Sequence, residues 1–143
     1  MRLLLQQQPV ARDLRIISAA LKMISDLERI GDQAADIADL APYIVSSSIS
    51  SKVQIHDMVA ATIRMVTLSV DAFVKNDLEL AESVVISDDI VDDLFNKVKG
   101  ELLDLIRKNN VDPRAALDIL MAAKYFERIG DHAVNVAEWY NIP

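Results

Sequence analysis

Cysteine is absent from this 143-residue chain, and glycine, proline and aromatic residues are scarce. The lack of cysteine excludes disulfides and thiolate metal sites, and it is compatible with a reducing compartment. Three glycines and four prolines provide few turns, so the composition favours a few long helices over a many-stranded sheet. Because apolar residues make up 52% of the chain and aromatic residues only 5%, the core has to be aliphatic.

Long hydrophobic runs and an excess of positive charge are also missing. No stretch of about 18 apolar residues lacks a charged residue, so we expect no membrane-spanning helix. Residues 1–8 do not resemble a secretion signal. The net charge of −7 argues against a nucleic-acid binder and favours cations or basic protein surfaces as ligands. These features predict a soluble, cytoplasmic protein.

One pentapeptide, Glu-Arg-Ile-Gly-Asp, occurs twice, at residues 28–32 and at residues 127–131. Residues around the two copies match at the same offset. The matching pairs are Asp13 and Asp112, Arg15 and Arg114, Leu21 and Leu120, Ala34 and Ala133, and Ala38 and Ala137. An identical pentapeptide inside a longer in-register match indicates an internal duplication.

The spacing of apolar residues predicts an all-α fold of four long helices, packed antiparallel where the connections are short. The first helix is expected over residues 13–43, with Asp13 as its N-cap and Pro42 in its end region. Its predicted buried stripe is Ile17, Ala20, Ile24, Leu27, Ala34, Ile37 and Ala41. The second helix is expected over residues 52–75. Its predicted buried side is Val59, Ile63, Val66, Val70 and Phe73.

The third helix is expected to begin at Leu78 or Glu79 and to end before Asn109. The fourth is expected to run to about Tyr140, capped by Asp112, with Pro113 at its first position. Residues 46–51 are almost all serine and are interpreted as a linker. Residues 52–143 would then form a complete three-helix repeat. Residues 1–45 would supply only the third helix of a shortened first repeat, with residues 1–8 as the end of a preceding helix.

Each copy of the pentapeptide places two carboxylates four residues apart, on one face of a helix. These pairs are Glu28 with Asp32 and Glu127 with Asp131, and the third helix carries a similar pair, Asp88 with Asp92. The last two pairs lie on helices joined by a short connection, so their four carboxylates are expected to converge. Such a cluster suits a hard or borderline cation, or several. The alternative is an ordinary solvated face whose charge Arg29 or Arg128 neutralises.

Gly31 and Gly130 lie inside predicted helices, where glycine costs roughly 1 kcal/mol relative to alanine. Their recurrence indicates either close helix packing or access for a ligand. His132 is interpreted as a surface histidine or a peripheral ligand. The sequence contains no Glu-x-x-His pair, no recognisable nucleophile–base arrangement and no glycine-rich phosphate loop. It therefore favours a non-enzymatic protein over a metal-dependent hydrolase or oxidase.

Several of these motifs together resemble the PhoU family of phosphate-uptake regulators. They are Ala-Arg-Asp-Leu-Arg at residues 11–15, Leu-Glu-Arg-Ile-Gly-Asp at residues 27–32 and Phe-Glu-Arg-Ile-Gly-Asp-His-Ala at residues 126–133. Residues 6–9, Gln-Gln-Gln-Pro, resemble the family's link between its second and third helices, and residues 84–92 resemble the start of its fifth. A typical member has two three-helix bundles, so the first two helices are missing here.

The resemblance implies a negative regulator of phosphate uptake and signalling that is cytoplasmic and reaches the membrane through its partners. Those partners would be the ATPase subunit of the phosphate ABC transporter and a phosphate sensor histidine kinase. It also implies iron or zinc clusters held by acidic motifs, which here are Asp88, Asp92, Glu127 and Asp131. Glu28 and Asp32 would form half of a second site, whose partner helix is missing.

Two further expectations follow from the residues themselves. The main alternative to a metal-binding regulator is a metal-free interaction module whose acidic pairs contact basic residues of a partner. In addition, the apolar stripe of the first helix needs cover, from the other three helices or from a second copy of the chain. We therefore expect a homo-oligomer, formed by helix exchange or by another pairing of copies.

Overall fold

The computed structural model describes residues 2–46, 53 and 55–138. It contains four helices: α1 (Arg2–Ser46), α2 (His56–Lys75), α3 (Leu78–Arg107) and α4 (Pro113–Glu138). The described residues contain no strand, so the predicted all-α fold is confirmed. In the same residues, no helix is both long and apolar enough to cross a membrane.

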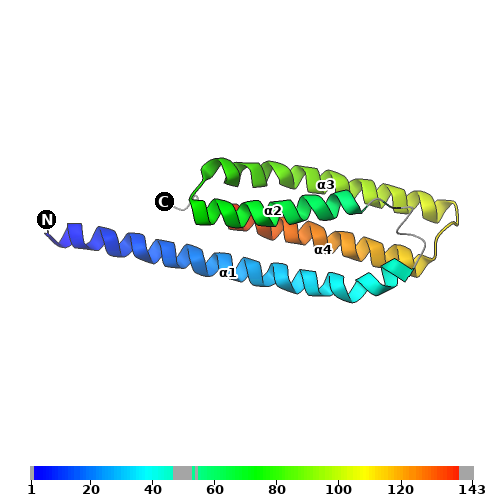
Figure 1. The fold of residues 1–143 in the computed structure, drawn as a ribbon, viewed down its shortest axis with the longest axis horizontal. Coiled ribbons are helices and arrows are strands. Elements are labelled where there is room, and N and C mark those ends of the chain that lie inside the picture. Colours follow the sequence, from blue (N-terminus) through cyan, green and yellow to red (C-terminus); the bar gives the residue numbers. More distant parts are fainter. Residues whose placement is uncertain (1, 47–52, 54, 139–143) are drawn as a thin grey trace.

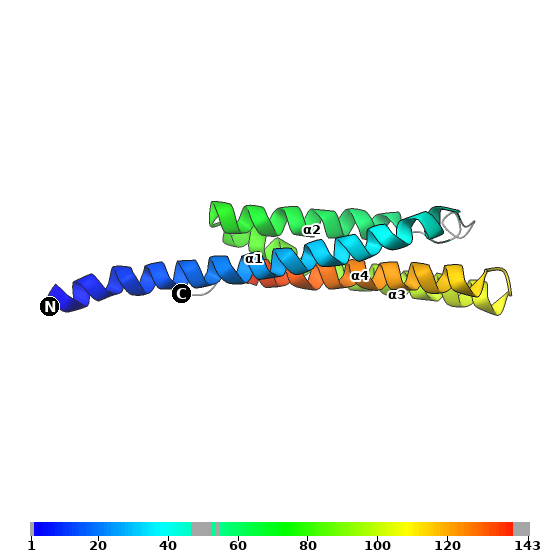
Figure 2. The same ribbon diagram turned by 90° about the horizontal axis from the view of Figure 1, so that it is seen from below.

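Helices α2, α3 and α4 form an antiparallel three-helix bundle, and α1 lies along α4 in the opposite direction (Figure 1). The N-terminal part of α1 projects well past the bundle, as the second view also shows (Figure 2). The two ends of α1 therefore lie in different surroundings. Its C-terminal half packs on other helices, whereas much of its N-terminal part stands alone.

Local sequence explains where the bundle helices begin and end. Asp77 caps α3, because its Oδ1 accepts hydrogen bonds from the backbone N–H groups of Glu79 and Leu80, at 3.0 and 3.2 Å. Asp112 precedes α4 and its carbonyl accepts from the N–H of Ala116, at 3.0 Å, which leaves Pro113 at the first helical position. These starts agree with the sequence prediction.

The predicted start of the first helix is wrong. Asp13 is not an N-cap, because α1 is already helical from Arg2 and passes through both Pro9 and Pro42. Residues 6–9, expected as a link, are helical as well. Ser46 ends α1, and the rest of the predicted serine linker lies outside the described residues. Each proline removes one backbone donor, and its ring clashes with the carbonyl of the preceding turn, yet α1 continues through both positions.

The predicted buried sides of the first two helices are also partly wrong. On α1, Ile17 and Ile24 are exposed, whereas Ala19 and Asp26 are buried. On α2 the whole face is displaced by one residue, and the residues actually buried are Met58, Thr62, Met65, Ser69 and Ala72. The small side chains on this face allow α3 and α4 to approach α2 closely.

The buried hydroxyl groups on α2 satisfy their hydrogen bonds within their own helix. Thr62 Oγ1 donates to the carbonyl of Met58 at 2.8 Å, and Ser69 Oγ donates to that of Val66 at 2.8 Å. They can therefore lie in the core without an unpaired polar group. The core itself is aliphatic as expected, built around side chains such as Met65, Val84 and Ile119.

Candidate functional site

The candidate site lies on the seam where α3 and α4 run side by side. Asp88 and Asp92 face it from α3, and Asp131 faces them from α4. One carboxylate oxygen from each of the three lies within 4.8 Å of the others. Two oxygens on opposite sides of one cation are about 5 Å apart, twice the metal–oxygen distance. All three carboxylates can therefore contact a single ion.

Burial and mutual repulsion make these carboxylates difficult to ionise. Burial, followed by the charges of Asp92 and Asp131, raises the pKa of Asp88 from 3.8 to about 6. The pKa of Asp92 is raised by burial and by the Glu127 carboxylate. The pKa of Asp131 is raised by burial and then by Glu127 and Asp92. A bound cation would relieve this repulsion.

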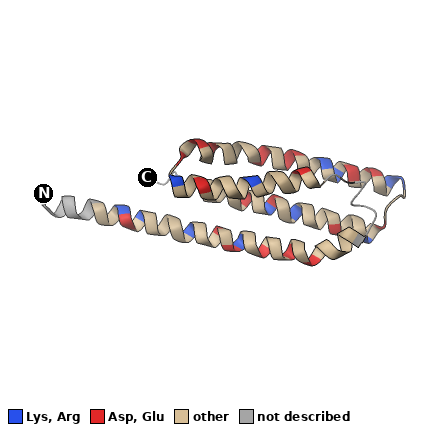
Figure 3. Ribbon diagram, in the orientation of Figure 1, with Lys and Arg blue, Asp and Glu red and all other residues tan. Residues whose placement is uncertain are grey.

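Asp88 provides the strongest indication that the seam can bind a cation. Its Oδ1 is buried and has no hydrogen-bond partner among the described residues. A buried acceptor left unpaired costs about 1–3 kcal/mol, whereas a cation at this position would satisfy it. Acidic residues occur on all four helices (Figure 3), so it is the convergence of Asp88, Asp92 and Asp131, together with the buried Oδ1 of Asp88, that distinguishes the seam.

Glu127, the fourth predicted ligand, belongs to the same seam but has another partner. Its Oε1 accepts from Lys124 Nζ at 2.6 Å, although its charge still acts on the three aspartates. Lys124 and Lys99 both lie over the ring of Phe95, at 5.4 and 5.2 Å from its centroid. The acidic cluster is therefore bordered by two lysines on an aromatic platform.

Beyond these lysines, toward the α3–α4 turn, the two helices enclose an apolar cavity of about 380 Å³. Its lining includes Leu103, Ile106 and Leu117, and all three are more than half exposed. An apolar patch of this kind, bordered by charged groups, is typical of a binding surface. The cavity and the acidic cluster lie on the same pair of helices, so one partner could contact both.

Gly130 explains why the pentapeptide on α4 fits here. A Cβ at this position would lie 3.5 Å from Met65 Sδ, 3.6 Å from Asp88 Oδ1 and 3.7 Å from Val91 Cγ1. These are ordinary van der Waals distances, so α2 and α3 lie close around this position of α4, and only a side chain larger than that of alanine would have to displace them. Of the two interpretations of this glycine, close helix packing accounts for the observed contacts.

The first copy of the pentapeptide has no comparable surroundings. Glu28, Gly31 and Asp32 are exposed, and a Cβ at Gly31 would meet nothing within 4 Å. In the described part of the chain, neither Glu28 nor Asp32 joins a group of three or more metal-ligating side chains. The predicted half-site therefore stays a prediction.

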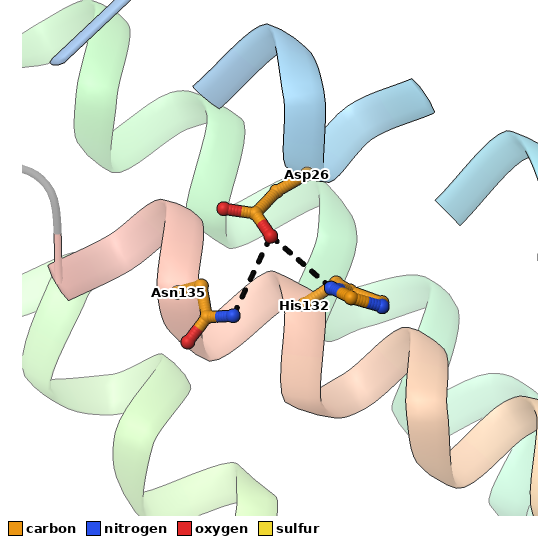
Figure 4. Close-up of polar contacts among 3 residues, drawn as sticks. All are labelled: Asp26, His132 and Asn135. Atoms are coloured by element: carbon orange, nitrogen blue, oxygen red, sulfur yellow. Dashed lines mark hydrogen bonds and ion pairs between the residues drawn. The ribbon is translucent and has the colours of Figure 1, made fainter. Parts of the chain in front are cut away.

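A polar contact that the sequence analysis did not find joins α1 to α4 next to the seam. Asp26 is 4% exposed, and its Oδ1 lies 3.1 Å from His132 Nδ1 and 3.4 Å from Asn135 Nδ2 (Figure 4). His132 is therefore not the surface histidine that was expected. One signal in the sequence was Asp26 itself, a charged residue at helical spacing from Ala19 and Met23 on the buried edge of α1.

The fold and the seam define a helical-bundle protein with a duplicated signature helix and a carboxylate cluster on its second copy. The family model of the PhoU domain matches residues 1–41 and 55–140. The chain belongs to the PhoU family, as its motifs indicated.

Individual relatives support this assignment. The chain is 39% identical to the phosphate-specific transport system accessory protein PhoU homolog of Pseudomonas aeruginosa, covering 96% of this chain and 57% of that protein. It is 32% identical to PhoU homolog 1 of Thermotoga maritima, covering 96% and 60% respectively. The chain therefore spans less than two thirds of the length of these curated relatives. Their names describe accessory proteins of a phosphate-specific transport system.

A solved structure gives the same result. The crystal structure of PhoU from Pseudomonas aeruginosa matches this chain with a TM-score of 0.83 and 38% identity. The match covers 97% of this chain and 68% of that one. Because the similarity extends over nearly the whole chain, it includes α1 as well as the three-helix bundle.

Proposed function

We propose that this chain is a non-enzymatic regulator of phosphate uptake and signalling, which acts in the cytoplasm and binds metal ions on the α3–α4 seam. Its partners would be the ATPase subunit of the phosphate ABC transporter and the phosphate sensor histidine kinase, both restrained by its binding. Contact with these partners would bring it to the membrane. Family membership supports the phosphate-transport role.

The observation that carries the metal proposal is the unpaired, buried Oδ1 of Asp88 within a cluster of three carboxylates. Asp88, Asp92 and Asp131 would hold the ion, and Glu127 would join them on release from Lys124. Carboxylate oxygens best suit hard cations such as Mg²⁺ and Mn²⁺. The iron or zinc implied by the family resemblance would need further ligands from water or from neighbouring ions.

A pair of matched variants tests the metal proposal. Asp88→Asn with Asp92→Asn removes two carboxylates from the seam, whereas Asp89→Asn with Asp93→Asn removes two exposed carboxylates from the same helix. Elemental analysis of protein purified without chelator should show metal in the wild type and in the second variant only. Equal metal content in all three proteins, or none in the wild type, would contradict the proposal.

The regulatory role is tested in cells that lack their own phosphate-transport accessory protein. Expression of this chain should restore repression of a phosphate-starvation reporter in phosphate-rich medium. The Asp88→Asn and Asp92→Asn variant should fail to do so, while the Asp89→Asn and Asp93→Asn variant succeeds. A wild-type chain that is expressed and folded but leaves the reporter fully active would refute the role.

A second candidate is a metal-free interaction module, which the apolar cavity beside the acidic cluster favours. The partner would insert apolar side chains between α3 and α4 and place basic residues against the carboxylates. Charge reversal, Glu127→Lys with Asp131→Lys, should then abolish binding of the ATPase subunit without any change in metal content. Loss of both metal and binding would instead favour the metal-dependent regulator.

A further inference from the structure

The apolar cavity near the α3–α4 turn has the size and lining of a small-molecule site. Leu102 and Ala116 are buried beneath it, whereas Leu103, Ile106 and Leu117 stand around it and are more than half exposed. Its volume of about 380 Å³ lies within the range of roughly 300–1,000 Å³ that small-molecule sites occupy. The cavity can therefore hold a small ligand, provided that most of the ligand is apolar.

The cavity is complete within two helices. All of its lining residues belong to α3, to α4 or to the turn between them, where Asn109 and Val111 lie at one end of it. Helix α1 packs on α4 but contributes no residue to the lining. The walls of the cavity therefore depend neither on α1 nor on where the chain begins.

One charged side chain, that of Lys99, lines the cavity. Its Nζ lies 5.2 Å from the centroid of the Phe95 ring, and it forms no ion pair within the described part of the chain. Lys124, which lies over the same ring, is instead paired with Glu127. Lys99 thus presents an ammonium group at the edge of an apolar cavity. This arrangement is complementary to an anion that carries an apolar tail.

We propose that the cavity binds a free medium-chain acyl carboxylate, with its carboxylate at Lys99 and its chain directed between α3 and α4 toward the turn. Lys99 and Ile106 are seven residues apart on α3, which corresponds to about 10 Å along the helix. An extended chain of roughly eight carbon atoms covers that length, because carbon–carbon bonds are about 1.5 Å long. This ligand goes beyond the proposed function, which requires neither a small molecule nor Lys99.

Isothermal titration calorimetry with decanoate tests the site. The buffer contains a chelator, so that the outcome does not depend on the metal proposal. We expect saturable binding of one decanoate per chain, below the concentration at which decanoate forms micelles. Octanoate should bind roughly tenfold more weakly, since burial of each CH₂ group raises affinity by about fourfold. Absence of saturable binding, or equal affinity for the two carboxylates, would overturn the proposal.

Two substitutions to tryptophan test where the chain lies. Leu117→Trp fills the cavity from an exposed position and should weaken decanoate binding by about tenfold or more. Val74→Trp is the control, because Val74 is exposed on α2 and does not line the cavity. Circular dichroism checks that both variants keep their helices. Equal affinity of the two variants for decanoate would place the ligand elsewhere and overturn the assignment.

A second pair of variants tests the role of Lys99. Lys99→Gln should weaken decanoate binding by up to about fivefold, the value of an exposed ion pair. It should also abolish the preference for decanoate over the uncharged decanol. Lys97→Gln removes the same charge about 200° around the same helix and should keep that preference. A Lys99→Gln variant that prefers decanoate as strongly as the wild type does would contradict the proposed orientation.

Vesicles of anionic phospholipid distinguish a free carboxylate from an acyl chain of a membrane lipid. Decanoate should bind in their absence, and the Leu117→Trp substitution should not change how much of the chain sediments with them. Co-sedimentation of the wild type but not of Leu117→Trp, without binding of decanoate, would assign the cavity to a bilayer lipid and overturn the proposal.

Discussion

The two copies of Glu-Arg-Ile-Gly-Asp have the same sequence and opposite surroundings. On α4, Gly130 is buried against α2 and α3, and Asp131 joins a cluster of three carboxylates. On α1, Gly31 and Asp32 are exposed, and no neighbouring side chain approaches the glycine. The pentapeptide alone therefore does not make a site. It contributes to an acidic cluster only where a second acidic helix lies beside it.

The residue that follows each copy shows the same contrast. After the α4 copy comes His132, which lies within hydrogen-bonding distance of Asp26. After the α1 copy comes Gln33, whose buried Oε1 has no hydrogen-bond partner in the described part of the chain. The interface between α1 and α4 thus provides a side-chain partner for His132 but none for Oε1 of Gln33 at the equivalent position. The two repeats therefore differ in their contacts as well as in sequence.

Metal affinity should give the largest difference between the copies. Asp88→Asn should weaken binding of Mn²⁺ by at least ~100-fold, because loss of a ligand exceeds the roughly 10–100-fold cost of losing a residue that merely supports one. Glu28→Gln should leave the affinity unchanged. Isothermal titration calorimetry measures both. Equal losses in the two variants would show that the first copy binds metal too and would remove the contrast.

Enlarging the two glycines should separate the copies by stability. Gly130→Leu has to displace Met65, Asp88 and Val91, and overpacking of this kind costs about 1–3 kcal/mol. Gly31→Leu meets open space and replaces a poor helix former, so it should stabilise the chain by up to about 1 kcal/mol. Urea denaturation gives both free energies. Similar values for the two variants would contradict the packing difference.

The contact between α1 and α4 should have a smaller effect. Asp26→Ala leaves the side chains of His132 and Asn135 without this acceptor, at a cost of about 1–2 kcal/mol in the free energy of unfolding. Asp36→Ala, an exposed position on the same helix, should change stability by less than about 0.5 kcal/mol. Thermal denaturation followed by circular dichroism compares the two. If Asp26→Ala were as stable as the control, the contact would not hold α1 in place.

The convergence of carboxylates at the α3–α4 seam could be predicted from the sequence, because helix geometry and one short connection place Asp88 and Asp92 opposite Asp131. The buried face of α2 could not be predicted in this way. The apolar pattern indicated Ile63 and Val70, whereas the structure buries Thr62 and Ser69 instead. Hydroxyl groups that bond to their own helix can enter a core, and an apolar pattern does not reveal this. The pairing of Asp26 with His132 depends on how α1 is aligned along α4, which local spacing cannot fix.

The pH dependence of stability should give the smallest difference. The pKa of Asp88 is 3.8 in the unfolded chain and about 6 in the fold, so the folded state binds more protons between these values. The free energy of unfolding should therefore decrease as pH rises from 3.8 to about 6. Since Asp88 is only partly buried, solvent screening limits this loss to about 1 kcal/mol. Asp88→Asn should flatten the decrease in metal-free buffer, whereas Asp32→Asn should retain it. A slope in Asp88→Asn that is as steep as in the wild type would assign the effect to other groups and contradict this difference between the two copies.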